Sequence, residues 1–426
     1  MTTRQGVDSE RRMGEGNLEM RAYSRIGAVA MTAIFAAEAA HAGGFSLRER
    51  SANAQGASFA GSTAAANDVT YSLFNPAALG KVRTIELGGA ISGVFPDITG
   101  TARVNGQEAR PGVIGVVPAS AFGYRLTEEF VVGLGIHSPF GLTTDYDDNF
   151  IGAADGIRSE LISIAVTPMI AWNVTDDFTL GGGLSIIYND PQLTRAVGVD
   201  GNGNVLEAKL NATDVAVSFN LGALWDVTDT TRIGIAYDYG YDIVTSGTLS
   251  AFDAAFNPID LPGDASISLP MKISAGLRQE LTDDLALLAE FEWANWSEFS
   301  EIQVNVPALA PNNDLSEPTD YKDSIFVAVG MEYDWDDALT LRAGVAYDET
   351  PTQRASRSLR IPDADRIWAS VGFSYEVSEA MKIDAGYSVV FFEDSDLTIM
   401  NGPAAGTIID YAGQTHIVAI GGTYRF

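Results

Sequence analysis

Ionisable side chains recur on the polar faces of segments in which polar and apolar residues alternate. The cations of this set are Lys272, Arg278, Arg342 and Lys382, and its anions are Glu290, Glu292, Glu332 and Asp384. Lys272 is placed nearest the middle of its segment, so we expect it to be the partner of a ligand carboxylate. For the other three cations an internal ion-pair network is the favoured interpretation, because buried charges need partners.

The sequence gives little support for a catalytic site. The chain has three histidines, of which His137 lies on a polar face and His416 lies near the start of the last segment. Neither stands in a Ser-His constellation or at metal-ligand spacing. The glycine-rich stretch AVGVDGNGNV is not followed by a helix, so it is not a phosphate loop. We therefore expect no enzyme, no cofactor and no metal site, and structural roles for both histidines.

The elements that would position these residues follow an export signal. Arg21 and Arg25 precede an apolar run over residues 26–37, and Ala40 and Ala42 supply small residues for cleavage. The run is too short for a transmembrane helix. Residues 1–42 are thus predicted to be a signal peptide, with Met20 as an alternative translation start because the preceding residues are acidic.

Composition excludes several classes of protein. The net charge of −30 argues against nucleic acid as a partner. The absence of cysteine excludes disulfides and a lipoprotein anchor. No segment after the signal approaches 18 consecutive apolar residues, so any membrane span must consist of strands.

Strict two-residue alternation dominates the chain after Thr84. In LTLRAGVAYDE, for example, Leu341 and Val345 share one face while Arg342 occupies the other. We count about fourteen such segments. They lie near residues 84–97, 115–126, 129–140, 160–174, 177–190, 213–227, 231–249, 265–281, 284–304, 320–335, 339–350, 365–377, 381–394 and 415–426.

The joints between these segments alternate between short acidic turns, such as DWDDALT, and long loops rich in Gly, Pro and Asn. This pattern is typical of an all-β, antiparallel transmembrane barrel of a Gram-negative outer membrane, with both termini in the periplasm. Aromatic residues at the segment ends are expected at the lipid-water interface. They are Trp172, Trp225, Tyr237, Tyr239, Tyr241, Trp293, Trp296, Tyr333 and Trp335.

The C-terminal stretch HIVAIGGTYRF ends in Phe426 and resembles the signal by which barrel-assembly machinery recognises its substrates. Outer-membrane lipid and this machinery are therefore expected partners.

A small-residue segment, residues 43–80, precedes the predicted barrel of residues 81–426. A barrel of about fourteen strands is too wide to be filled by its own side chains. We therefore expect this segment to form compact helical turns that plug the lumen, with Gly56 and Gly61 allowing close approach to the wall. Asn75 and Pro76 should stop any helix before the first strand.

The stretch GFSLRERSANAQGASFAGSTAAANDVTYSLFNPAAL resembles the N-terminal hatch of the FadL/TodX family of outer-membrane transporters, and IHSPFGLTTDY resembles that family's third-strand region. The resemblance implies a monomeric fourteen-stranded barrel that takes up long-chain fatty acids or aromatic hydrocarbons. It implies that ligand binds an outer groove, moves to an interior site at the N-terminus and leaves sideways near the third strand.

Carried onto this sequence, the resemblance assigns gating roles to residues of two segments. They are Gly44, Phe45, Asn75, Pro76 and Ala77 of the hatch, and Ser138, Pro139, Phe140 and Gly141 beside the lateral gap. Pro139 supports the gap because proline cannot donate a ladder hydrogen bond, although a strand that simply ends there is the alternative.

The expected outer groove lies in the loop SAFDAAFNPIDLPG, which exposes Phe252, Phe256, Ile259 and Leu261. The preceding loop, residues 191–214, is polar and is less apolar than such a groove requires.

The leading hypothesis is therefore passive uptake of hydrophobic small molecules. A porin for hydrophilic solutes is the alternative, and an outer-membrane lipid hydrolase is a distant third.

Overall fold

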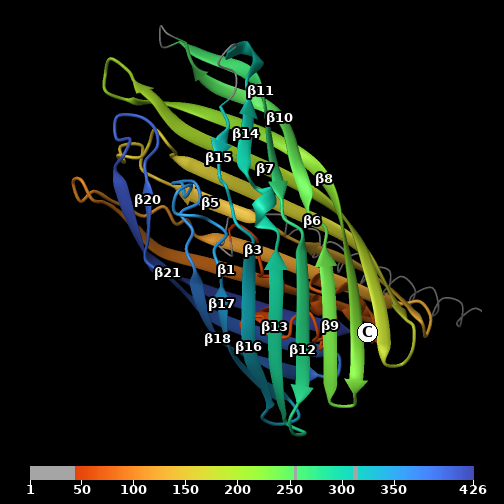
Figure 1. Cartoon of the computed structure of the whole chain (residues 1–426). Helices are drawn as coiled ribbons and strands as arrows, with labels where there is room; N and C mark the ends of the chain where they lie inside the picture. The colour runs from red at the N-terminus through yellow and green to blue at the C-terminus, as the bar shows by residue number, and fades with distance from the viewer. Residues whose placement is uncertain (1–43, 254–256, 310–314) are drawn as a thin grey trace, which may run out of the picture. The chain divides into compact units, whose positions relative to one another are not determined.

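The computed structural model describes residues 44–253, 257–309 and 315–426 (Figure 1). The predicted signal peptide, residues 1–42, and Phe256 of the predicted groove lie outside the described residues. No helix in the described part of the chain has the length and apolar character to cross a bilayer.

The described residues form an antiparallel sheet that closes on itself. Its strands are β1 (Ile85–Ala102), β2 (Glu108–Ala109), β3 (Gly115–Arg125), β4 (Phe130–His137), β5 (Gly141–Asp145), β6 (Arg158–Asn173), β7 (Phe178–Val199), β8 (Val205–Thr228), β9 (Thr231–Asp238), β10 (Tyr241–Phe252), β11 (Pro258–Leu269), β12 (Lys272–Glu280), β13 (Leu285–Ala294), β14 (Glu301–Asn305), β15 (Glu317–Pro318), β16 (Ser324–Asp334), β17 (Leu339–Asp348), β18 (Arg366–Ser378), β19 (Met381–Phe392), β20 (Ser395–Thr398) and β21 (Ile408–Arg425).

The ring is closed by the first and last long strands. In β1, Ile91 faces Pro118 of β3 on one side and Ile420 of β21 on the other. Counted over the described chain, the strands make fourteen consecutive passages of a closed barrel, which confirms the predicted fold. Closure gives the wall strands neighbours on both sides over most of their length, as backbone groups within a bilayer require.

Alternation along the strands separates an outer apolar face from an inner face. In β17, Leu341 and Val345 are exposed on the outside while Arg342 is buried inside, as predicted. The acidic turns behave as Asx turns: Asp336 Oδ1 accepts the backbone N–H groups of Ala338 and Leu339, each at 2.9 Å.

Three neighbouring passages that the sequence predicted as single strands are each interrupted at the same level. The breaks fall between β9 and β10, between β11 and β12 at Pro270, and between β13 and β14 at η3 (Trp296–Glu298). Proline removes a ladder donor. The breaks turn Tyr241 and Trp296 inward, where both are buried, so their predicted place at the lipid interface is wrong. By contrast, Trp172, Trp225, Tyr239, Tyr333 and Trp335 are exposed as predicted.

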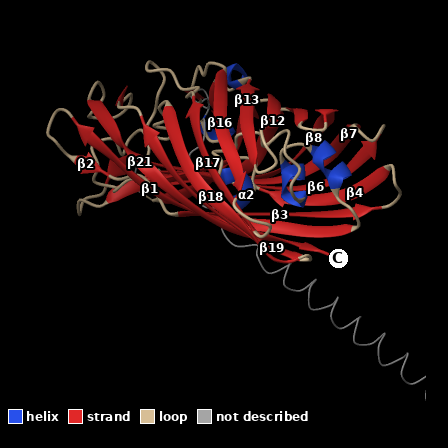
Figure 2. Cartoon of the chain, turned by 90° about the horizontal axis from the view of Figure 1, so that it is seen from below, coloured by secondary structure: helices blue, strands red, loops and turns tan. Residues whose placement is uncertain are grey.

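The segment of residues 44–82 is buried within the ring of strands (Figure 2). It contains the short helix α2 (Ala52–Gln55) and the 3-10 turns η1 (Val69–Leu73) and η2 (Pro76–Lys81). A further 3-10 turn, η4 (Pro307–Leu309), lies outside this segment. Between them α2, η1 and η2 contact β1, β3, β4, β6, β7, β8, β18, β19 and β21. The predicted compact helical turns are thus present.

Side-chain caps start each of these turns. Ser51 accepts from Ala54 N–H, Asp68 from Thr70 N–H, and Asn75 from Ala77 N–H. The preceding turn η1 does end at Leu73, just before Asn75 and Pro76, but these two residues also begin a further turn before the first strand. Asn75 caps η2, and Pro76 occupies the first position of η2. A backbone N–H at that position would have no acceptor within the turn, so proline loses no hydrogen bond there.

Candidate functional site

The N-terminal end of the described chain lies in an aromatic cluster inside the barrel. The ring of Phe45 lies 4.9 Å from that of Trp296, 5.4 Å from Phe299 and 5.9 Å from Phe140. Gly44 has a φ of +65°, and its backbone N–H donates to Asp363 Oδ2 at 2.9 Å. A Cβ at Gly44 would lie 2.9 Å from the Trp296 ring, so glycine is needed for both the conformation and the space.

The barrel wall breaks where this end of the chain meets it. Leu47 N–H donates to Pro139 O at 3.0 Å, and Gly141 N–H donates to Phe45 O at 2.9 Å. Residues 45–47 therefore pair with the interruption between β4 and β5 as a short extra strand. Ser138, also buried, lies in the same interruption.

The interruption leaves part of β3 without a partner on one side. The β3–β4 ladder ends at the pair Ser120 and Ile136, and an isolated bridge joins Gly112 to Thr144 further along. Between these pairings, residues 115–119 of β3 pair with β1 and with no residue of β4 or β5 in the described chain. A strand that simply ends at Pro139 does not fit, because β5 resumes the passage at Gly141.

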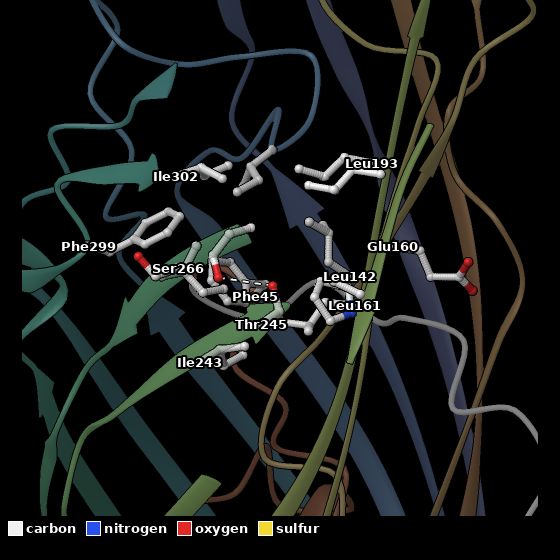
Figure 3. Close-up of a pocket in the computed structure, with 16 residues that line it drawn as sticks. Phe45, Leu142, Glu160, Leu161, Leu193, Ile243, Thr245, Ser266, Phe299 and Ile302 are labelled. Atoms are coloured by element: carbon white, nitrogen blue, oxygen red, sulfur yellow. Dashed lines mark hydrogen bonds between the residues drawn. The ribbon is translucent and has the colours of Figure 1, made fainter. Parts of the chain in front are cut away.

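An apolar cavity lies directly against Phe45 (Figure 3). The volume open to the centre of a water molecule within it is about 60 Å³. Its lining consists of Phe45, Leu142, Glu160, Leu161, Pro191, Leu193, Leu210, Ala212, Ile243, Thr245, Ala265, Ser266, Ile267, Phe299, Ile302 and Ile361.

The few polar side chains of the apolar cavity already have hydrogen-bond or ion-pair partners. Thr245 Oγ1 donates to Ala265 O at 2.9 Å, and Ser266 Oγ donates to Gln303 at 2.8 Å. The Glu160 carboxylate lies 3.1 Å from Arg158, and Figure 3 shows it directed away from the apolar side chains. The cavity therefore offers contact with hydrocarbon and no free charge.

A second hollow, the outer groove, adjoins the apolar cavity. The volume open to the centre of a water molecule within it is about 240 Å³, and its lining includes the predicted residues Phe252, Ile259 and Leu261. These residues lie on the paired strands β10 and β11, and not on an irregular loop as the sequence suggested. Leu193 and Leu210 line both hollows, so the two lie side by side at these residues.

Residues 191–214 contribute more to the outer groove than their composition indicated. β7 extends to Val199 and β8 begins at Val205, so this stretch is mostly strand. Alternation then gathers its apolar residues on the inner face, where Leu193, Val197 and Leu210 line the groove. The expectation that this stretch is too polar for a groove is wrong, because mean composition ignores which face each residue occupies.

Lys272 stands at the first position of β12 and not in mid-strand. It lines neither the apolar cavity nor the outer groove. It lines a third and smaller hollow, the inner chamber, together with Arg50, His137, Pro139 and Phe140, and the volume open to the centre of a water molecule there is about 40 Å³. Its Nζ lies 3.4 Å from Ser46 Oγ and 5.8 Å from the centre of the Phe140 ring.

Asn75, Pro76 and Ala77 lie beneath these hollows against the wall. Asn75 Nδ2 donates to Thr63 O at 2.8 Å and to Ala223 O of β8 at 3.0 Å. Gly181 of β7 makes room for this motif, since a Cβ there would overlap the backbone of Pro76 and Ala77.

The other predicted lumen charges form ion pairs, as expected. Arg342 pairs with Glu332 at 2.7 Å, and Arg278 pairs with the same carboxylate at 2.9 Å. Lys382 pairs with Asp68 of the N-terminal segment at 2.6 Å. Burial by itself raises the pKa of Asp68, but Lys382 and the Thr70 hydrogen bonds outweigh it and hold the pKa below the ordinary value of 3.8.

The histidines show no arrangement for hydrolysis. His137 is buried in the inner chamber, and its Nδ1 has no hydrogen-bond partner among the described residues. His416 lies within β21, with Nδ1 2.8 Å from the Tyr387 hydroxyl. In the described ranges no group of three His, Cys, Asp or Glu side chains is placed to hold a metal ion.

Known proteins resemble this chain over most of its length. Outer membrane protein P1 of Haemophilus influenzae is 27% identical and covers 91% of this chain and 96% of its own. A long-chain fatty acid transport protein of Escherichia coli is 26% identical and covers 89% and 93% respectively.

Solved structures share the fold. A FadL homologue of Pseudomonas aeruginosa superposes with a TM-score of 0.79 at 23% identity, covering 90% of this chain and all of its own. The Pseudomonas putida toluene transporter TodX superposes with a TM-score of 0.69 at 17% identity, covering 88% and 98%. The sequence model of the family described as outer membrane protein transport protein (OMPP1/FadL/TodX) matches residues 33–426. The chain therefore belongs to this family and resides in the outer membrane of a Gram-negative bacterium.

Proposed function

We propose that this protein takes up hydrophobic small molecules, long-chain fatty acids or aromatic hydrocarbons, across the outer membrane by passive diffusion. The observation that carries the proposal is that an apolar outer groove and an apolar cavity adjoin at Leu193 and Leu210. Relatives named as long-chain fatty acid and toluene transporters support the substrate class.

Transfer from water supplies the driving force for capture. Each Å² of apolar surface removed from water contributes about 25 cal/mol, so a ligand moves spontaneously from the outer groove into the apolar cavity. Phe45 forms part of the cavity wall and is paired to the interruption at residues 139–141. Displacement of Phe45 then opens the route past Pro139 toward the unpaired part of β3, which is the lateral exit to the membrane.

Residues 43–80 act as the plug of the barrel, and residues 81–426 act as its wall. A lumen of this width admits hydrophilic solutes unless it is filled. The segment contacts strands around the ring and is buried over most of its described length, which supports this role. The protein functions as a monomer in outer-membrane lipid without enzymatic activity, and Phe426 addresses it to the barrel-assembly machinery.

Mass spectrometry of the organic extract of purified protein tests the substrate class. We expect fatty acids, detergent or aromatic compounds in stoichiometric amounts, together with little steady conductance in planar bilayers. A porin for hydrophilic solutes predicts the opposite pair of results: no bound hydrophobic compound and a large steady conductance. That outcome would refute the proposal. Release of free acid from phospholipid or ester substrates would instead favour the hydrolase.

A further inference from the structure

Two strands of the wall, β8 and β10, lie beside each other without ladder pairing over part of their length. The β8–β9 ladder extends only as far as Asn220, and the β8–β10 ladder begins at Thr213. Within the described chain, residues 214–218 of β8 therefore have a strand partner only on the β7 side. This stretch and residues 239–245 across from it are called the β8–β10 seam.

The outer face of the β8–β10 seam is apolar. Val215, Val217 and Val244 are each more than half exposed, while the intervening residues Ala216 and Ile243 are buried on the opposite face. The exposed set therefore belongs to the lipid-facing side of the barrel, where alternation places apolar side chains.

Backbone groups at the seam lack ladder partners. At the lower end of the seam, Phe219 O accepts the backbone N–H of Tyr239 at 2.9 Å. Every second residue of an antiparallel strand directs its backbone groups to the same side, so those of Val217 and Val215 also point into the seam. Such groups are tolerated at membrane depth only where they are buried in protein or line a water-filled cavity. The seam is therefore expected to adjoin a hollow.

The inner chamber is that hollow. Ser218 and Tyr241, whose side chains are buried, line it at the seam. Phe219 and Tyr239 also line it, although their rings are exposed and stack on each other with centres 4.8 Å apart. The lining thus passes from the inner to the outer face of the wall. Pro139 of the interruption between β4 and β5 also lines the chamber, which therefore touches two weak places in the wall.

Few contacts hold the seam closed. Ser218 Oγ donates to Tyr239 O at 2.6 Å, and the Tyr241 hydroxyl lies 3.4 Å from Ser163 Oγ. Parting an intact ladder of the same length would break a series of backbone hydrogen bonds, each of which contributes to stability. The seam therefore opens at a lower cost in free energy than the paired parts of the wall.

We propose that the β8–β10 seam is a second lateral gate, through which hydrophobic molecules pass between the inner chamber and the membrane. The proposal rests on the uptake proposed above and adds a route to it, separate from the exit beside Pro139. The outer edge formed by Val215, Val217 and Val244 suits an aliphatic or aromatic hydrocarbon and disfavours hydrated solutes.

A reversible bridge across the seam tests the gate. The chain has no cysteine, so Val215→Cys/Val244→Cys has two thiols that a bis-methanethiosulfonate reagent joins and a reductant releases. Continuing the β8–β10 register places these two positions opposite each other. The matched control is Ile186→Cys/Val217→Cys, because these outward-facing residues are already paired in the β7–β8 ladder.

Release of bound pyrene from the full barrel in brominated phosphatidylcholine, chased with unlabelled phenanthrene, would be followed by quenching of pyrene fluorescence. We expect the bridge to slow release by at least about twofold, because one of two lateral routes is closed, and the reductant to restore the rate. A route affects rates and not equilibrium, so the dissociation constant should stay unchanged. The control bridge should change neither quantity.

The outcomes separate the gate from the proposed function. Release from the bridged protein at the control rate would overturn the gate while uptake stands. Failure of the unaltered protein to bind either pyrene or a long-chain fatty acid would overturn the proposed function itself.

A second measurement needs no bridge. Ser218→Cys, on the chamber side of the seam, should react with a maleimide carried on a phospholipid acyl chain. Ser370→Cys should not react, because Ser370 is comparably buried on the inner face of β18, which is paired on both sides. An unreactive Ser218→Cys with unchanged far-UV circular dichroism, or equal reaction of the two variants, would also contradict the gate.

Discussion

The close contact between the N-terminal segment and the barrel wall leads to a testable prediction. Gly386 of β19 contacts α2 so closely that a Cβ there would lie 2.7 Å from Ala52 O and 3.2 Å from Gly56 N. Ordinary contact begins at 3.4 Å, so Gly386→Ala must move α2 by about 0.7 Å. The wall cannot yield instead, because Gly386 is paired in its ladder with Gly372 on one side and with Ala419 on the other.

A second wall glycine contacts the same segment and can be substituted together with Gly386. A Cβ at Gly344 of β17 would overlap the backbone of Ala57, at a separate point of the same segment. Overpacking costs about 1–3 kcal/mol per site; because the two sites press on the adjacent residues Gly56 and Ala57, their costs do not simply add, and the double variant should cost at least as much as the costlier single one. The double variant Gly344→Ala/Gly386→Ala should therefore spend much of its time with the segment displaced.

The assay is conductance in planar bilayers, with far-UV circular dichroism as the check on the barrel. We expect the double variant to show frequent open-channel events and an unchanged strand signal. Gly201→Ala is the matched control, since a Cβ there meets nothing within 4 Å. Conductance equal to that of the control would refute the reasoning, because either the segment does not rest on these glycines or it does not close the lumen.

Three further predictions concern the ligand route and the seat. Phe45→Ala removes an aromatic side chain from the wall of the apolar cavity. It should weaken the binding of hydrophobic ligands by about 1.5–3 kcal/mol, measured by displacement of a fluorescent probe. Unchanged affinity would show that Phe45 does not contact the ligand. Leu210→Glu puts a carboxylate where the groove meets the cavity and should abolish uptake of labelled fatty acid without unfolding the barrel, and normal uptake would contradict the route. The Asp68–Lys382 pair predicts a pH dependence: since the pKa of Asp68 is lowered, its contribution is complete above 3.8 and is lost as pH falls below that value. Conductance should be flat from neutral pH to about 5 and rise below about 3.8, whereas Asp68→Asn should conduct at all pH values without that step.

The barrel follows from local sequence because alternation is a local property. Each strand encodes its own outer and inner face, as Leu341 and Arg342 illustrate, and closure then follows from the need to satisfy every backbone group in hydrocarbon. The ion pairs of Arg342 and Lys382 were predictable as a class for the same reason. The partner of Lys382 in the N-terminal segment, Asp68, was not, because no local pattern records which residue of that segment meets which strand of the wall.

The binding hollows depend on tertiary structure. Leu193 and Leu210 belong to a stretch of polar average composition, and only pairing of β7 with β8 brings them together on one face. The sequence predicts Trp296 and Tyr241 at the lipid-water interface. In the structure both are buried, because breaks in neighbouring strands turn them inward.

The sequence by itself determined an antiparallel outer-membrane barrel of about fourteen strands, since periodicity and turn chemistry are local signals. Only the tertiary structure decided that Lys272 joins Arg50 in a chamber apart from the apolar cavity. The reason is physical: a hollow forms where several elements fail to fill the space between them, and that space is fixed by strand register and strand breaks across the ring, which no single segment encodes.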